Sequence, residues 1–336
     1  MTQSARVKAG PPALIVAGPT ASGKSTLALA LAERLGGTVI NADSMQVYRE
    51  LRILTARPTA EEEARVPHRL YGIRPAAEAA SVAWWREQAL AEMAAARAAG
   101  RLPILCGGTG LYFLSLTEGL SAIPPVPEAA REEARRLLAR LGAPGLHARL
   151  AEADPETAAT LRPGDSQRIA RAFEVWRGTG RGLLAWQREG AQTGPARLHG
   201  LPWRFAAVLL DPPREALRAA IISRFDAMLA AGALEEVRAL GALNLDPALP
   251  AMRAHGVPEL LAHLAGRMTL AAARERAVLN TGQYTKRQAT WFRHHALSSS
   301  GAAPPDTHII HARIEGTAQF QESLVPGILA FVDSGR

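Results

Sequence analysis

Short runs rich in apolar residues alternate with longer amphipathic stretches along the first third of the chain. Runs of four or five such residues, bounded by Gly or polar residues, predict buried strands at Ala13–Ala17, Thr38–Ala42 and Pro103–Cys106. Apolar residues at helical spacing predict helices at Thr26–Leu35 and Ala76–Ala99. This alternation predicts an α/β fold with a parallel sheet, whose ligands bind at the carboxyl ends of the strands.

The same alternation returns in the second half of the chain. Phe205–Leu210 reads as another core strand, and Arg214–Ala230 carries an apolar stripe typical of a helix. We also expect a short strand at Leu70–Ile73 and a final strand at Thr307–His311, with a helix after it. The Ser/Pro-rich stretch Ser298–Asp306 predicts a loop.

A different composition separates these two regions. After the Pro-rich segment Pro124–Pro127, the chain is rich in Arg and Ala, and Pro and Gly interrupt it repeatedly. Helical patterns occupy Glu128–Leu141, Leu146–Ala153 and Gln167–Arg177. We therefore predict a flexible arm at 1–12, a P-loop-type α/β core made of 13–120 and 203–336, and an inserted, mostly helical lobe at 121–202.

Composition narrows the class of protein. The formal net charge of +8 favours a polyanionic partner, although an Arg-rich genome would have the same effect. Cys106 is the only cysteine, so an internal disulfide is impossible and we expect a reducing, cytoplasmic environment. Residues 1–12 lack the apolar core of a signal peptide, and no apolar run approaches the length of a membrane span.

The strongest chemical signal is a phosphate-binding loop. The pattern G-x-x-x-x-G-K-[ST] lies between the first strand and the first helix, where backbone N–H groups and the helix dipole favour an anion. Only three of the 39 basic residues are lysines, and one of them occupies the lysine position of this pattern. We expect Lys24 to bind a phosphate and the Ser25 hydroxyl to be a Mg²⁺ ligand. The loop consists of Gly18, Pro19, Thr20, Ala21, Ser22, Gly23, Lys24 and Ser25.

Two further strand ends carry polar side chains. Asp43 follows the second strand and could hold Mg²⁺, act as a general base, or simply cap a helix. The segment Asp43–Gln46 concentrates groups that suit the edge of a nucleic-acid base. Thr109 follows two glycines and could reach an anionic leaving group, or could belong to an ordinary turn.

The segment Thr281–Arg293 has a nucleic-acid-binding character. Basic and amide side chains are interleaved with aromatic ones, and Gln283, Lys286 and Arg287 fall near one helical face. A solvated helix face is the alternative. Gln167–Arg171 is a second, weaker segment of this kind.

Together these segments resemble the tRNA dimethylallyltransferase family. The matching stretches run in order through most of the chain: Gly18–Ser25, Asp43–Tyr48, Thr55–Pro58, Pro67–Leu70, Gly107–Tyr112, Asp165–Arg168, Lys286–Gln288 and Trp291–Phe292. The resemblance implies that a dimethylallyl group moves from its diphosphate to the exocyclic amine of the adenosine 3′ of the anticodon, with Mg²⁺ as cofactor. No nucleoside triphosphate is then needed, and we expect a monomer that binds no membrane.

The resemblance also implies roles for individual residues. Asp43 and Thr109 would be catalytic, and the P-loop would hold the donor's diphosphate together with Arg224. The residues that we expect to contact the tRNA anticodon stem-loop are Asp43, Ser44, Met45, Gln46, Thr109, Arg131, Gln167, Arg168, Ile169, Ala170, Arg171, Thr281, Gln283, Lys286, Arg287 and Gln288.

This chain departs from the family pattern at three positions. Leu54 stands where Gly is usual, Arg57 where Lys is usual, and Gly282 where Arg is usual. Two other classes of function also fit the P-loop: a small-molecule kinase or nucleotide hydrolase, and a nucleic-acid-binding module with a vestigial loop. A kinase usually has an apolar strand ending in a Mg²⁺-binding Asp, whereas the strand at Ile104 ends in Cys106-Gly107-Gly108.

Overall fold

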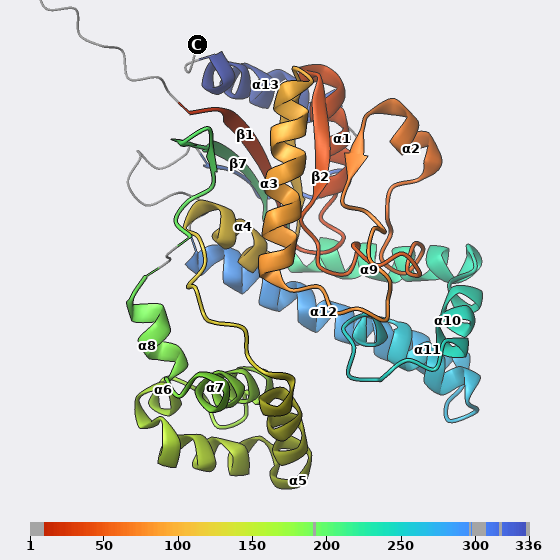
Figure 1. Ribbon diagram of the computed structural model, residues 1–336. Helices are drawn as coiled ribbons and strands as arrows, with labels where there is room; N and C mark the ends of the chain where they lie inside the picture. The colour runs from red at the N-terminus through yellow and green to blue at the C-terminus, as the bar shows by residue number, and fades with distance from the viewer. Residues whose placement is uncertain (1–9, 191–192, 296, 298–306, 316–317, 334–336) are drawn as a thin grey trace, which may run out of the picture. The chain divides into compact units, whose positions relative to one another are not determined.

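The computed structural model describes residues 10–190, 193–295, 297, 307–315 and 318–333 (Figure 1). The predicted loop at Ser298–Asp306 and the first nine residues of the predicted arm at 1–12 lie outside this part of the chain. Two compact units divide the chain, one formed by residues 1–117 and 195–336 and the other by residues 118–194.

The boundaries of the inserted unit lie three and eight residues before the predicted positions of 121 and 202. The second boundary differs because residues 195–202 belong to the core unit, where they include the small hairpin of β5 (Arg197–Leu198) and β6 (Leu201–Pro202). The Ala196 N–H donates to Leu116 O at 2.8 Å, and the Trp203 N–H donates to Ala196 O at 2.9 Å. These bonds join the hairpin to the core, because Leu116 lies in the last turn of the core helix α4 (Gly110–Thr117).

A six-stranded sheet forms the centre of the core, in the order β3-β2-β4-β1-β7-β8. Each neighbouring pair is parallel, which confirms the predicted α/β class. The apolar runs are buried because helices cover both faces of the sheet. The strands are β1 (Pro12–Ala17), β2 (Gly37–Asn41), β3 (His68–Arg69), β4 (Leu102–Gly107), β7 (Arg204–Leu210) and β8 (Thr307–Ile310).

The predicted strand at Leu70–Ile73 is wrong. The edge strand β3 occupies the two preceding residues instead. Leu70 has a φ of 65° and Gly72 a φ of 61°, and left-handed residues at two of four positions cannot extend a strand.

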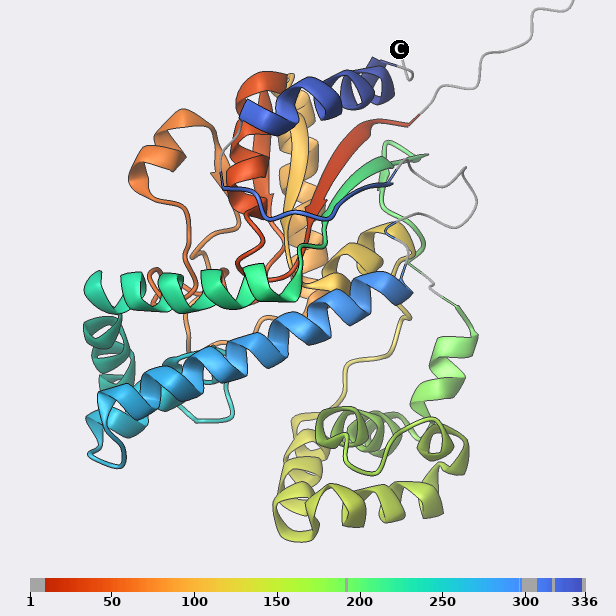
Figure 2. The ribbon, with the colours of Figure 1, turned by 180° about the vertical axis from the view of Figure 1, so that it is seen from behind.

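Helices lie on both faces of the sheet (Figures 1 and 2). On one face is α3 (Val82–Ala98), and on the other are α1 (Lys24–Leu35) and α13 (Ala318–Asp333). Below the carboxyl ends of the strands, α9 (Arg214–Ala230) packs against the long helix α12 (Leu270–His294). The remaining core helices are α2 (Ala60–Arg65), α4 (Gly110–Thr117), α10 (Ala233–Ala242), η1 (Ala251–Arg253) and α11 (Val257–Leu264).

Helix α3 begins six residues later than the pattern predicts. The N–H groups of Ala76 and Ala80 donate instead to the Glu50 carboxylate at 2.8 Å and the Tyr48 hydroxyl at 3.1 Å. Ser81 then caps the helix by accepting from Trp84 N at 3.1 Å.

The inserted unit has its own small core. It contains α5 (Glu128–Ala153), α6 (Pro155–Ala159), α7 (Ser166–Thr179) and α8 (Leu183–Arg188). The predicted break between two helices is present as a kink inside α5, where Gly142 has a φ of 67°. Leu137, Leu146, Leu150, Ile169 and Phe173 pack together between α5 and α7.

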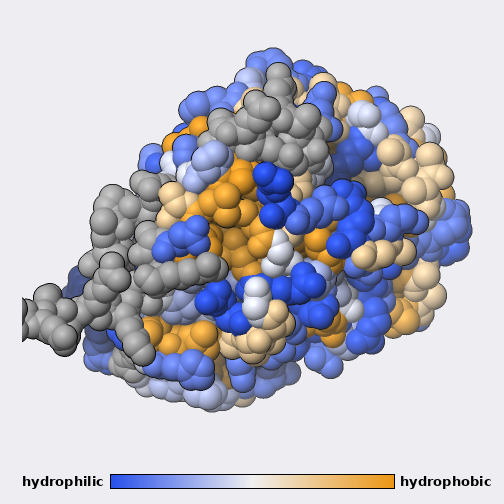
Figure 3. Space-filling view, turned by 90° about the horizontal axis from the view of Figure 1, so that it is seen from above, coloured by the Kyte–Doolittle hydropathy of each residue, from blue (hydrophilic) through white to orange (hydrophobic). Residues whose placement is uncertain are grey.

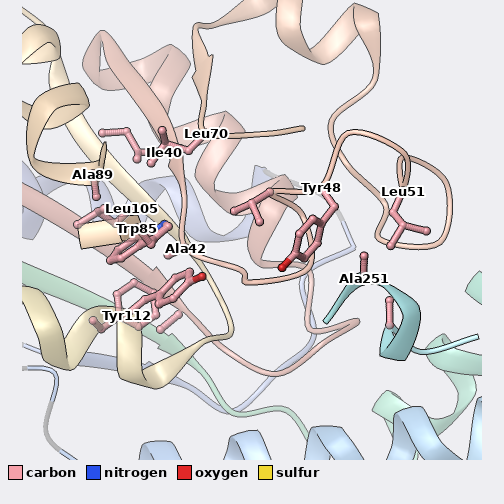
Figure 4. Close-up of a cluster of buried hydrophobic side chains, with 14 of the residues drawn as sticks. Ile40, Ala42, Tyr48, Leu51, Leu70, Trp85, Ala89, Leu105, Tyr112 and Ala251 are labelled. Atoms are coloured by element: carbon pink, nitrogen blue, oxygen red, sulfur yellow. The ribbon is translucent and has the colours of Figure 1, made fainter. Parts of the chain in front are cut away.

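A buried aromatic stack fixes α3 and α4 near the carboxyl ends of β2 and β4. The rings of Trp85 and Tyr112 lie 4.1 Å apart and nearly parallel (Figure 4). The Trp85 indole N–H donates to Asn41 O, the last residue of β2, at 2.8 Å. This bond satisfies the only polar group of a fully buried side chain and holds the strand end in place.

None of the helices in the described ranges combines the length and apolar character needed to cross a membrane. On the face shown in Figure 3, hydrophilic side chains surround smaller apolar areas. The buried apolar side chains are instead concentrated around the sheet.

Two glycines in the core lead to opposite stability predictions. A Cβ at Gly107 would lie 2.1 Å from the backbone of Ala42, so we expect Gly107→Ala to lower the free energy of unfolding by about 3 kcal/mol. A Cβ at Gly282 would meet no atom, so Gly282→Ala should raise it by about 1 kcal/mol. Chemical denaturation of both variants measures the difference, and equal stabilities would contradict the close approach at Gly107.

Candidate active site

The P-loop joins β1 to α1 and keeps a helix N-terminus open for an anion. Gly23 caps α1 with a left-handed φ of 88°, and Ala21 also has a positive φ, of 66°. The first turn of α1 contains no acidic residue. The positive end of the helix dipole is therefore not neutralised from within the helix.

Lys24 is buried within this loop. Its Nζ donates to Pro19 O at 3.3 Å, and its side chain is 9% exposed. Burial lowers the pKa of Lys24, and the nearby Asp43 carboxylate partly opposes this shift. A bound anion would favour the charged ammonium in the same way, so this lysine is suited to a phosphate.

Asp43 is held in a tight turn directly after β2. Its backbone N–H donates to Asn41 Oδ1 at 2.8 Å, and its Oδ1 accepts from Met45 N at 2.9 Å. This Asx turn fixes the carboxyl group toward the pocket that Lys24 also lines.

Thr109 lies beside this turn at the end of β4. Its N–H donates to Ala42 O at 3.2 Å, and its Oγ1 accepts from Ser44 N at 3.0 Å. The two loops at the sheet edge are thus joined through the Thr109 hydroxyl, which also contacts Ser44 Oγ at 3.4 Å.

One pocket collects the phosphate loop, the Asp43 turn and the helices below the sheet. Thr20, Lys24 and Ser25 line it together with Asp43, Met45 and Gln46. Arg224 of α9 lines the same pocket, where burial lowers its pKa and Asp43 opposes the shift. The apolar wall consists of Leu54, Ile221, Phe225, Met228 and Ala254, and Thr55, His255, Thr281 and Tyr284 complete the lining.

Tyr284 links the pocket to the catalytic candidates. Its hydroxyl interacts with the side chains of Thr109 and Gln288, and burial raises its pKa above the ordinary value. The ring lies 4.7 Å from that of His255. The raised pKa keeps the phenol protonated, so its hydroxyl can donate a hydrogen bond to one of these side chains.

Gln288, which we expected to contact tRNA, is buried. Its side chain is 5% exposed, and its Oε1 accepts from the backbone N–H of Thr20 at 2.9 Å. Its Nε2 donates to Gly108 O at 3.0 Å. The amide therefore joins α12 to the P-loop and to the end of β4. Thr281 is also buried and donates to Ala277 O.

Other candidates on α12 are exposed. Gln283, Lys286 and Arg287 lie on the solvent side of the helix. The Arg287 guanidinium lies over the Tyr284 ring, 5.6 Å from its centroid. These side chains leave a basic surface next to the pocket wall.

The candidate arginines of the inserted unit are exposed, whereas another candidate, Ile169, is buried. Arg131, Arg168 and Arg171 form ion pairs with Glu128, Asp165 and Glu174 on their own helices or caps, at 3.5, 3.6 and 2.6 Å. Gln167 is exposed and Ala170 is half-buried. The Ile169 side chain is fully buried in the core of this unit, so it cannot be a surface contact.

The residues present suit Mg²⁺ only together with a phosphate ligand. In the described part of the chain, no three His, Cys, Asp or Glu residues cluster as a metal site. The pocket does offer the Ser25 hydroxyl and the Asp43 carboxylate, which are hard oxygen ligands. Mg²⁺ is commonly held by one or two protein oxygens, with substrate phosphates and water supplying the rest.

Sequence reasoning missed several lining residues. Tyr284 lies within the recognised segment Thr281–Arg293, but its role depends on the rotation of α12 about its axis. His255 carries no local signal and enters the pocket only through tertiary packing, whereas Phe225 lies on the predicted apolar stripe of Arg214–Ala230 and only its place in the pocket was not predicted. Of the departures from the family pattern, Leu54 lines the apolar wall, while Arg57 donates to the carbonyls of Tyr48 and Arg49 at 3.3 and 3.1 Å.

The chain is similar to known proteins over most of its length. Residues 46–295 match the model of the IPP transferase family. The chain is 60% identical over 320 residues to a tRNA dimethylallyltransferase of Granulibacter bethesdensis, covering 95% of this chain and 97% of the relative. It is 57% identical over 336 residues to that of Acidiphilium cryptum, covering 99% of each chain.

A solved structure shares the fold over nearly the whole length. The full-length tRNA isopentenylpyrophosphate transferase of Bacillus halodurans is 30% identical, with a TM-score of 0.67 and coverage of 97% of both chains. Because the family model, the relatives and the solved structure all agree, the chain belongs to the tRNA dimethylallyltransferase family.

Proposed function

We propose that this protein transfers the dimethylallyl group of dimethylallyl diphosphate to the N6 amine of the adenosine 3′ of the anticodon in tRNA. The observation that carries the proposal is the two-sided pocket, in which Lys24 and Arg224 face an apolar wall and Asp43 lies in the same space. A short prenyl diphosphate has an anionic end and an apolar end that match these two sides.

The P-loop side of the pocket would stabilise the leaving diphosphate. As the bond from the allylic carbon C1 to oxygen breaks, negative charge grows on the diphosphate and positive character grows on the five-carbon fragment. The loop's N–H groups, Lys24 and Arg224 would counter the negative charge, and the Thr109 hydroxyl would turn from Ser44 to donate to the bridging oxygen. Mg²⁺, held by Ser25 and the phosphates, would supply further positive charge there.

Asp43 would act on the nucleophile. The adenine N6 forms a bond to C1 as the C1–O bond breaks, and one N6 proton passes to the Asp43 carboxylate. The backbone bond from Met45 N to Asp43 Oδ1 would keep the carboxylate aimed during this transfer. Diphosphate then leaves, and the proton passes to water.

The adenosine must leave its stack to reach a pocket inside the protein. Unstacking costs a few kcal/mol, and contacts with the tRNA backbone must offset it. The exposed Gln283, Lys286 and Arg287 of α12, and Arg131, Gln167, Arg168 and Arg171 of the inserted unit, are suited to that role.

A P-loop kinase or nucleotide hydrolase is the alternative. Such enzymes usually hold Mg²⁺ with an acid at the end of a central strand, whereas β4 ends at Gly107 and continues into Gly108 and Thr109. Incubation with ATP, and separately with dimethylallyl diphosphate and tRNA, distinguishes the two. Nucleotide turnover without prenylated tRNA would overturn the proposal.

The two lysines in the described part of the chain allow the donor site and the tRNA surface to be tested separately. Lys24→Ala should raise the KM for the donor and lower kcat, because the ammonium serves both the bound donor and the leaving diphosphate. Lys286→Ala should leave the donor KM unchanged and raise the KM for tRNA. Steady-state kinetics with each substrate varied in turn measures both effects. An unchanged donor KM in Lys24→Ala would reject the P-loop as the diphosphate site.

Replacing the proposed base without removing its turn isolates the chemical step. Asp43→Asn keeps an oxygen that can accept from Met45 N, so we expect a fall in kcat of about 10²–10⁴ with donor binding intact. Asp246→Asn is the matched control, because Asp246 Oδ1 accepts from Ala248 N in the same kind of turn on an exposed loop. Single-turnover rates and calorimetric donor affinity test this, and equal rates for the two variants would make Asp43 structural.

The proposed tRNA surface predicts a change in salt dependence. Lys286→Ala and Arg168→Ala should each weaken tRNA binding and reduce the slope of log affinity against log salt by about 1. Gly282→Arg should tighten binding and steepen the slope, because it adds a cation beside Gln283. Affinities measured across a salt series decide the question. If log affinity against log salt has the same slope in all variants, these surfaces face solvent and do not bind tRNA.

A further inference from the structure

The segment 311–315 passes over the P-loop after leaving β8 (Figure 2). The Ile314 N–H donates to Ser22 O at 3.0 Å, and Arg313 Nε donates to Ala21 O at 3.1 Å. Two successive carbonyls of the phosphate loop are therefore bound by two successive residues of this segment. We call residues 311–315 the strap.

These bonds determine which way the loop's peptide groups point. In a trans peptide, the C=O of one residue and the N–H of the next point in opposite directions. Because Ser22 O is held by the strap, the Gly23 N–H points to the other side of the loop. The Ser22 N–H likewise points away from the strap and donates to Pro19 O at 3.3 Å, which is also where Lys24 Nζ is bound.

The loop needs such support because its backbone is unfavourable. Ala21 has a φ of 66°, a left-handed conformation that costs an alanine about 1 kcal/mol or more. Arg313 binds the carbonyl of this same residue. The external bond therefore stabilises the peptide whose conformation is least favoured by the local sequence.

The strap itself is anchored on both sides. Upstream, β8 pairs with β7 from Ala207–Thr307 to Leu210–Ile310, and the Asp211 N–H donates to Ile310 O at 2.9 Å. Downstream, the Ile314 side chain is 2% exposed and packs in the same apolar cluster as Val325 and Ile328 of α13. A Cβ at Gly23 would lie 2.1 Å from Ile314 O, so the strap and the loop are in direct contact.

We propose that the strap is a positioning element for the donor site: Arg313 holds the Ala21 carbonyl and Ile314 holds the Ser22 carbonyl, so that the loop keeps its turn and the Gly23 N–H faces the diphosphate. The proposal rests on the assignment of the donor to the P-loop. It adds residues that touch neither substrate, on a segment that carries no phosphate-binding motif. Arg313 also pairs with Glu315, which keeps its guanidinium beside the loop.

The test removes one strap bond at a time. Ile314→Pro deletes the N–H that binds Ser22 O, and Ile314→Val is its control because it keeps the N–H and most of the side chain. Arg313→Met removes the bond to Ala21 O, whereas Arg313→Lys keeps a donor. Arg238→Met, an exposed α10 arginine paired with Glu235, controls for loss of an arginine in general.

We expect Ile314→Pro and Arg313→Met each to raise the donor KM and the Kd of inorganic pyrophosphate about five- to tenfold, while the tRNA KM stays within about twofold. Ile314→Val and Arg238→Met should match the parent, and Arg313→Lys should recover most of the loss. If Ile314→Pro does not fold, the comparison of Arg313→Met with Arg313→Lys tests the proposal by itself. If Arg313→Met binds pyrophosphate as tightly as the parent does, the proposed positioning role of the strap is wrong.

Lys24→Ala separates this proposal from the one on which it rests. If Lys24→Ala loses pyrophosphate affinity and the strap variants do not, the P-loop binds the donor but the strap does not position it. If Lys24→Ala also keeps its affinity, the diphosphate binds elsewhere and both proposals fail.

Discussion

One buried amide, that of Gln288, holds the site together. It accepts from the P-loop through Thr20 and donates to the end of β4 through Gly108, so it joins elements 268 and 180 residues away. A side chain with both a donor and an acceptor is required, which a carboxylate or an ammonium cannot supply. Because this bond sets the rotation of α12, Tyr284 faces the pocket while Lys286 and Arg287 face solvent.

The pocket gains its two-sided character from two different sources. Its polar side comes from loops at the carboxyl ends of parallel strands, where backbone N–H groups and short polar side chains gather. Its apolar side comes from α9 and from the loops that carry Leu54 and Ala254. A charged group and a hydrocarbon group can then bind side by side without either entering an environment that suits the other.

The sequence predicts best what depends on neighbours along the chain. The P-loop, the parallel strands and helix Arg214–Ala230 are all local patterns, and each is present in the structure. The burial of Gln288 was not predicted, because a polar residue on a helix can equally well face solvent or satisfy buried backbone groups, and only the packing of α12 decides. His255 and Arg313 went unrecognised for the same reason, since their partners lie far away along the chain. The failed strand at Leu70 depended on φ angles that the residue type does not reveal.

The strap has a consequence for the order in which the protein is made. The Arg313–Ala21 bond spans 292 residues, which a ribosome adds in roughly 15–60 s at about 5–20 residues per second. During that interval the nascent P-loop lacks the bonds to its Ala21 and Ser22 carbonyls. A growing chain therefore carries a phosphate loop that is only partly organised, and it completes this loop late in translation. Ribosome-bound intermediates should accordingly bind phosphate compounds less readily than the released enzyme.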